Sequence, residues 1–128
     1  MNERLRKARR VLAVQTLLDR LADWRLRDLE RQELALQESR RDLIRFLDSE
    51  SAFAGLFAAT LMRRMQSLED LRVALIAERE AQASLHLEER SRMRRAERIV
   101  DALDDQARRT EEARRLAEVV ERAVNGRA

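Results

Sequence analysis

The chain's only interior segment with helix-ending character reads Asp48-Ser49-Glu50-Ser51-Ala52-Phe53-Ala54-Gly55. The side chains of Asp48, Ser49 and Ser51 can cap backbone amides. Gly55 can adopt a left-handed backbone conformation, which often ends a helix. We therefore place a hairpin turn at residues 48–55. Either Ser49 or Ser51 would cap the next helix, or Gly55 would act as the pivot if that helix starts late, and the sequence leaves these options open.

Before this turn, apolar residues recur at helical spacing and predict one long amphipathic helix over residues 4–47. The predicted apolar seam consists of Val11, Val14, Leu18, Ala22, Leu26, Leu29, Leu36, Leu43 and Leu47. Glu33 and Arg40 fall where the heptad repeat asks for apolar residues. Two consecutive four-residue steps, from Leu18 to Leu26, predict a stutter that locally unwinds a supercoil.

After the turn, a second periodic run predicts a longer helix over residues 56–124. Its clearest part alternates steps of three and four over four heptads, through Ala96, Ile99, Leu103, Gln106, Thr110, Ala113, Ala117, Val120 and Val124. Glu and Arg four residues apart predict weak ion pairs on the opposite faces: Glu88 with Arg92, Glu111 with Arg115, and Glu118 with Arg122. Asn125 and Gly126 read as the C-terminal stop of this helix.

The composition favours long helices over a compact globular domain. Charged residues make up 40% of the 128 residues and aromatic residues only 3%, and proline is absent. We predict an all-α fold in which two long helices form an antiparallel coiled-coil hairpin with a longer second helix, as one unit over residues 1–128. The second helix would extend past the first by about 30 Å. An apolar stripe on that overhang needs a partner, because helices gain most of their stability by packing such a stripe.

Residues that could support catalysis are scarce. The chain has no cysteine, one histidine and no glycine-rich loop, so we expect no enzyme activity, no metal site, no cofactor and no small-molecule substrate. We interpret His86 as a half-exposed helix residue without a functional role. We interpret Trp24 as packing at the edge of the seam, with an exposed anchor for a partner as the alternative.

Hydropathy and charge predict a soluble, cytoplasmic protein with no membrane span. The run from Val11 to Leu18 is too broken for a signal peptide, and the stretch from Ser51 to Met62 falls far short of the roughly 20 residues that a spanning helix needs. The 27 basic and 24 acidic residues leave a net charge of +3. Because acidic residues offset the arginine clusters, we do not expect nucleic-acid binding, although a basic coiled coil that associates with nucleic acid stays as a weaker alternative. The basic, apolar start of the first helix leaves membrane-surface binding as another.

The predicted architecture resembles a known family. The chain is similar to the flagellar type III export component FliJ and its YscO-type relatives in virulence secretion. The similarity lies in its size, the first helix over residues 4–47, the turn at 48–55 and the longer second helix. The resemblance spans nearly the whole chain and implies a cytoplasmic antiparallel coiled coil similar to the central stalk of rotary ATPases. It implies two protein partners, a hexameric export ATPase and an export-gate membrane protein, and a role in coupling them.

Two groups of residues are candidate protein-binding sites. The first surrounds the turn and contains all three phenylalanines: Leu43, Phe46, Phe53, Phe57 and Leu61. The second lies at the open end, where the chain begins and ends: Arg4, Arg9, Arg10, Arg114 and Arg115. For the first group, capping of the hairpin core is the competing interpretation. For the whole chain, the main alternative is a structural or adaptor coiled coil that dimerises and tethers other proteins.

Overall fold

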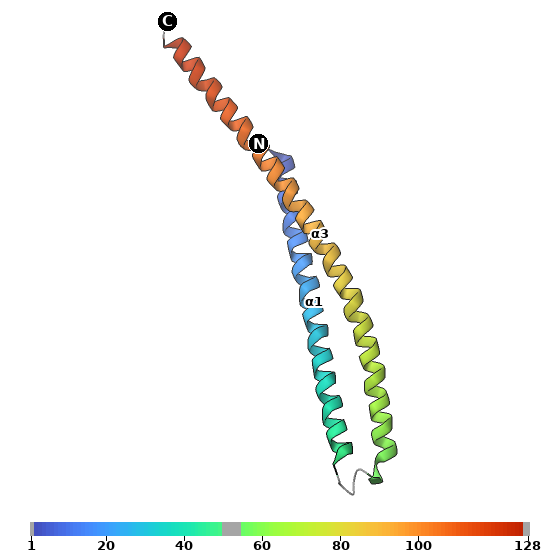
Figure 1. Ribbon diagram of the computed structural model, residues 1–128. Helices are drawn as coiled ribbons and strands as arrows, with labels where there is room; N and C mark the ends of the chain where they lie inside the picture. Colours follow the sequence, from blue (N-terminus) through green and yellow to red (C-terminus); the bar gives the residue numbers. More distant parts are fainter. Residues whose placement is uncertain (1, 50–54, 127–128) are drawn as a thin grey trace. The chain divides into compact units, whose positions relative to one another are not determined.

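A computed structural model describes residues 2–49 and 55–126 of the chain. These residues form two long helices, α1 (Glu3–Asp48) and α3 (Ala58–Asn125), and no strand occurs among them (Figure 1). The helices pack against each other as an antiparallel hairpin, and α3 is the longer, with 68 residues against 46. The predicted all-α hairpin with a longer second helix is therefore confirmed.

The chain divides into two compact units. The terminal unit comprises Met1–Asp19 and Glu89–Ala128, and the middle unit comprises Arg20–Glu88. Each unit therefore contains a piece of α1 and a piece of α3. Both units expose much of their apolar surface, because a pair of helices buries only the narrow seam between them. Among the described residues, the buried apolar side chains are Leu5, Ala22, Leu68 and Ala96.

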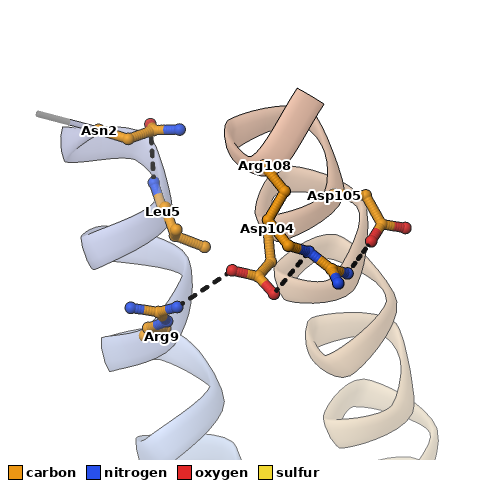
Figure 2. A network of polar contacts seen from close by, with 6 residues as sticks. All are labelled: Asn2, Leu5, Arg9, Asp104, Asp105 and Arg108. Carbon is orange, nitrogen blue, oxygen red and sulfur yellow. Dashed lines mark hydrogen bonds and ion pairs between the residues drawn. The ribbon is translucent and has the colours of Figure 1, made fainter. Parts of the chain in front are cut away.

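Local hydrogen bonds explain where α1 begins and ends. The Asn2 side chain caps the first turn, because its Oδ1 accepts a hydrogen bond from the Leu5 amide at 3.2 Å (Figure 2). At the other end, the Ser49 amide donates to the Arg45 carbonyl at 3.0 Å, and the Ser49 hydroxyl donates to the Phe46 carbonyl at 2.6 Å. Ser49 therefore completes α1 and does not cap the second helix as proposed. The alternative cap, Ser51, lies outside the described residues.

Gly55 does not take the left-handed conformation that the sequence suggested, whereas the predicted stop of the second helix at Asn125 and Gly126 is confirmed. Gly55 has a helical backbone, and neither Gly55 nor Gly126 has a positive φ. The predicted left-handed pivot at Gly55 is therefore wrong, because helical winding is already present at that residue. Residues 50–54 of the predicted turn lie outside the described residues. At the C-terminal end, α3 stops at Asn125, and the Gly126 amide donates to the Arg122 carbonyl at 2.8 Å.

In the middle unit the seam follows the predicted residues of α1. From Ala22 onward a row of buried or half-buried positions alternates in steps of four and three: Ala22, Leu26, Leu29, Glu33, Leu36, Arg40, Leu43 and Leu47. Asp23 and Asp28, outside this row, are half-buried as well. On α3, Leu68 is the most buried side chain, with 3% of its surface exposed. Glu33 and Arg40, the two polar residues at heptad positions that call for apolar ones, therefore lie within this seam.

In the terminal unit the predicted α1 seam is wrong. The buried or half-buried positions there include Leu5, Ala8, Leu12, Gln15 and Asp19, whereas Val11, Val14 and Leu18 are exposed. These positions keep the alternation of three and four up to Ala22, so the predicted stutter is absent. Asp19 occupies the seam position predicted for Leu18, so the seam shifts by one residue and Val11, Val14 and Leu18 lie outside it.

The predicted α3 seam of the terminal unit also needs correction. Ala96 is buried and Leu103 is half-buried, as expected, but the other seam positions are Met93, Val100 and Ala107. Ile99 is 55% exposed, and Gln106 is exposed as well. The seam that faces α1 therefore contains Val100 in place of Ile99, and Ala107 in place of Gln106. Every residue from 112 to 126, here called the terminal segment, is exposed.

The chain's single tryptophan lies on the surface of the middle unit. Trp24 is 57% exposed, because Ala22 and Leu26 occupy the seam on either side of it. This exposure favours the alternative interpretation of Trp24, that of an exposed anchor for a partner. His86 is half-buried on α3, in keeping with the sequence interpretation.

Candidate protein-binding surfaces

A bidentate ion pair crosses the seam of the terminal unit. Arg90 on α3 donates from Nε to Oδ1 of Asp19 at 3.1 Å and from Nη2 to Oδ2 at 3.2 Å. The Asp19 side chain is only 8% exposed, whereas the Arg90 side chain is 43% exposed. Two parallel charge-assisted hydrogen bonds fix both the distance and the relative rotation of the two side chains. This pair therefore accounts for an aspartate at a seam position.

The two polar seam positions of the middle unit also have partners of opposite charge on α3. Arg79 Nε lies 2.8 Å from Glu33 Oε2, and Arg40 Nη1 lies 3.8 Å from Glu69 Oε2. A nearby hydrogen bond joins the Gln82 side-chain amide to the Ala22 carbonyl at 3.2 Å. Because a slip of either helix would part these groups, they favour one register of the hairpin. Their role is in pairing the helices.

A groove of mixed apolar and polar lining lies in the middle unit. Three of the predicted binding residues, Leu43, Phe46 and Leu61, line an open groove of about 350 Å³ together with Ser39, Asp42, Arg64 and Leu68. We call this the turn-side groove. Phe46 is exposed and Leu43 and Leu61 are half-buried, so the groove presents apolar side chains beside charged ones. Such a mixture suits reversible contacts with a protein partner.

Phe57 does not line the groove. Phe57 is exposed just before the start of α3, next to the strongly exposed Leu56, and it is not among the residues that line the groove. The Phe57 carbonyl accepts a hydrogen bond from the Leu61 amide at 2.8 Å, which ties its backbone to the first turn of α3. Phe53 lies outside the described residues.

Charged side chains surround the start of α1 in the terminal unit. Arg9 Nη2 donates to Asp104 Oδ1 at 3.3 Å, and Asp104 also lies 3.9 Å from Arg108, which pairs with Asp105 (Figure 2). Arg4 lines a crevice of about 460 Å³ with Asn2, Leu103, Gln106, Ala107, Thr110 and Glu111. Arg10 is exposed. Of the predicted basic residues at this end, Arg4 and Arg9 thus lie along the line where α1 meets α3.

The terminal segment combines exposed charge with exposed apolar side chains. Arg114 and Arg115 lie 3.1 and 3.4 Å from Glu111 Oε1, so the predicted pair between Glu111 and Arg115 is confirmed. Glu118 lies 4.0 Å from Arg114, and Arg92 pairs with Glu89 where the sequence suggested Glu88. The large apolar residues of this segment are all more than half exposed: Leu116, Val119, Val120 and Val124. Leu116 and Val119 were missed because they lie outside the predicted seam.

These surfaces carry no arrangement that suggests chemistry at a metal. Among the described residues, no group of three or more His, Cys, Asp or Glu side chains is placed to hold a metal ion. Within residues 2–49 and 55–126, no helix is long and apolar enough to cross a membrane. In comparisons with known proteins, no family model, no curated protein and no solved structure matches this chain.

Proposed function

We propose that the protein is a non-enzymatic helical-hairpin component of a bacterial type III protein export apparatus, flagellar or virulence-related. In this role it couples a hexameric export ATPase to an export-gate membrane protein. The proposal follows the resemblance drawn from size, helix lengths and turn position. It requires two separate binding sites for proteins, one for each partner.

The terminal segment is the observation that carries the proposal. It continues α3 beyond the part that packs on α1, and all its residues are exposed (Figure 1). An apolar stripe that stays in water is costly, because helices gain most of their stability by packing such a stripe against a partner. Interspersed Arg and Glu side chains make this surface suited to a polar ring interior, where contacts must form and break. We therefore assign the ATPase to this segment.

The turn-side groove supplies the second site. It lies in the middle unit, so a partner bound there would not occupy residues of the terminal unit. Phe46 lines the groove, and Phe57, which is 52% exposed, precedes the groove residue Leu61 by four residues in the sequence. Large exposed aromatic side chains are typical anchors of protein interfaces. We assign the export gate to this surface.

The test is to measure ATP hydrolysis by the export ATPase encoded in the same gene neighbourhood, with and without this protein. A variant truncated after Thr110 keeps nearly all of the part of α3 that packs on α1, and we expect it to lose the stimulation of ATP hydrolysis. The matched variant F46A/F57A retains the terminal segment, so it should stimulate the ATPase normally and lose binding to the gate. Full stimulation by the truncated variant would refute the assignment of this segment to the ATPase.

One observation favours a second function, that of an adaptor coiled coil that dimerises and tethers other proteins. The exposed apolar residues of the terminal segment would also suit pairing with another helix. An adaptor of this kind would leave the ATP hydrolysis rate unchanged in the same assay. Neighbouring genes without any flagellar or secretion component would favour the adaptor.

A further inference from the structure

The apolar side chains of the terminal segment form a stripe of their own. At about 100° per residue, one face about 120° wide carries Ala113, Leu116, Ala117, Val120, Ala123 and Val124. All six are exposed. The α1-facing row, represented by Val100 and Ala107, projects to a face roughly 150° from Val120. The stripe shares a heptad position with Ala96 and Leu103 through Ala117 and Val124, but it lies away from the row of Val100 and Ala107. Because the whole stripe lies beyond the part of α3 that packs on α1, a partner can occupy it without opening the hairpin.

We propose that this stripe pairs with the same stripe of a second copy of this chain, in antiparallel orientation. In the pairing that we infer, Ala117 of one copy faces Val120 of the other. Residues 112–126 of one copy then lie along residues 111–125 of the second. Glu111 is the last half-buried residue of α3, so the pairing covers the exposed segment and stops where α1 begins to cover α3.

Side-chain size supports this register. Ala113 faces Val124 of the second copy, Ala117 faces Val120, and at the edge of the stripe Leu116 faces Ala123. By symmetry each of these layers occurs twice. Every layer thus joins an alanine to a larger aliphatic side chain, which is how facing positions fill the space between helices without voids or overlap.

Charge supports the same register independently. In a heptad repeat with Ala117 and Val124 at one seam position and Ala113 and Val120 at the other, Arg114 and Glu121 flank the seam. In an antiparallel pair these flanking positions face each other. The inferred register places Arg114 of each copy beside Glu121 of the other, which gives two pairs of opposite charge. Flanking charges of this kind set the orientation and the register of paired helices.

The alternative pairings fit less well, both in side-chain size and in charge. A shift of one heptad in either direction places Arg114 opposite Arg114 or Glu121 opposite Glu121, and the first shift also places Leu116 against Leu116. A parallel pair brings Arg109 beside Arg114 of the second copy and faces Ala117 with Ala117, which leaves space at that layer. Like charges oppose association, and small residues that face each other give little contact area.

This inference does not rest on the proposed export function. It does involve the segment that we assign to the ATPase, so a self-paired copy and an ATPase-bound copy would exclude each other. A failure of self-pairing would leave the ATPase assay unaffected, and the two proposals therefore fail separately.

Sedimentation equilibrium of the full chain at concentrations up to about 1 mM tests the pairing. We expect a reversible monomer–dimer equilibrium. R114E and E121R should each weaken dimerisation roughly tenfold, because two attractive pairs become repulsive, and the double variant R114E/E121R should restore it. A chain that is monomeric at every concentration, or a double variant that does not recover, would overturn the proposal.

A core variant with a matched control tests whether the stripe itself is the interface. V120D should abolish the dimer, whereas V73D, at a similarly exposed position on α3 in the middle unit, should leave it unchanged. Circular dichroism of each variant shows whether the helices persist. Equal loss of dimer in both variants would overturn the assignment of the interface to the stripe.

Orientation can be measured directly, because the chain contains no cysteine. Spin labels on E118C and N125C occupy equivalent heptad positions. In the inferred pair, the two copies of residue 118 lie at almost the same level, and those of residue 125 are about 20 Å apart along the axis. A clearly longer distance for the residue 125 labels supports antiparallel pairing, and equal distances would contradict it.

Discussion

Two neighbouring stretches of α3 differ in burial although their compositions are similar. From Glu89 to Glu111 the helix packs on α1, and Ala96 there is 6% exposed. In the terminal segment, Ala117 occupies the same heptad position as Ala96, yet it is exposed. The difference shows that the partner helix, and not the heptad pattern, decides which residues are buried. An apolar pattern identifies a surface able to pack, and the length of α1 decides how much of that surface does.

Truncation of apolar side chains should give the largest difference in stability between the part of α3 that packs on α1 and the terminal segment. L68A removes the most buried leucine, and we expect the free energy of unfolding to fall by about 2–3 kcal/mol, near the low end for a leucine because the seam is narrow. L116A removes a leucine that is 65% exposed and should change that energy by less than about 0.5 kcal/mol. Urea unfolding followed by circular dichroism measures both. Equal losses would mean that the terminal segment is packed in the monomer.

The ion pair across the terminal unit should respond asymmetrically to the loss of either partner. R90A leaves the buried carboxylate of Asp19 without its guanidinium, and we expect a loss of about 1–3 kcal/mol at neutral pH. D19L should cost less or even stabilise, because leucine suits the seam and the half-exposed Arg90 remains hydrated. Urea unfolding of both variants gives the comparison. A larger cost for D19L would show that Arg90 depends on Asp19 more than the reverse.

The sequence predicts the hairpin and the α1 seam of the middle unit, but not the seam of the terminal unit. The absence of proline, the capping segment at 48–55 and the periodic apolar residues were enough for the two helices and the longer α3. The α1 seam near the N-terminus was misassigned because Val11, Val14 and Leu18 are larger and more apolar than Ala8, Gln15 and Asp19. Asp19 becomes a seam residue only when Arg90 lies opposite, and a single helix pattern does not contain that information.

The binding surfaces illustrate the same limit. The sequence identified Leu43, Phe46 and Leu61 as members of one group. The structure brings them into one groove because Leu43 and Phe46 lie about one turn apart on α1 and Leu61 of α3 lines the same groove. Ile99 and Val100 are adjacent apolar residues, and either fits an alternation of three and four. Only the position of α1 selects Val100. In the terminal segment the predicted seam does contain four residues of the stripe, Ala113, Ala117, Val120 and Val124, and it misses Leu116 and Ala123.

The ion pairs that join Glu111 to two arginines of the terminal segment should matter least. E111Q removes the carboxylate near both Arg114 and Arg115, and we expect a change in the free energy of unfolding of at most about 0.5 kcal/mol, because both arginines are well exposed. Urea unfolding at about 0.05 M and 0.5 M salt would reveal any contribution, which salt should screen. A loss near 2 kcal/mol would mean that these charges are buried by a partner.

On this account, α3 is stabilised only where another helix packs on it. Hydrogen exchange along α3 tests this claim most directly. At low protein concentration, we expect amides between residues 93 and 107 to be protected through the packing on α1, and amides of the terminal segment to exchange much faster. Raising the concentration should slow exchange in the terminal segment alone as copies pair. Equal protection of both stretches at low concentration would contradict the account, because the terminal segment would then be stable without a partner.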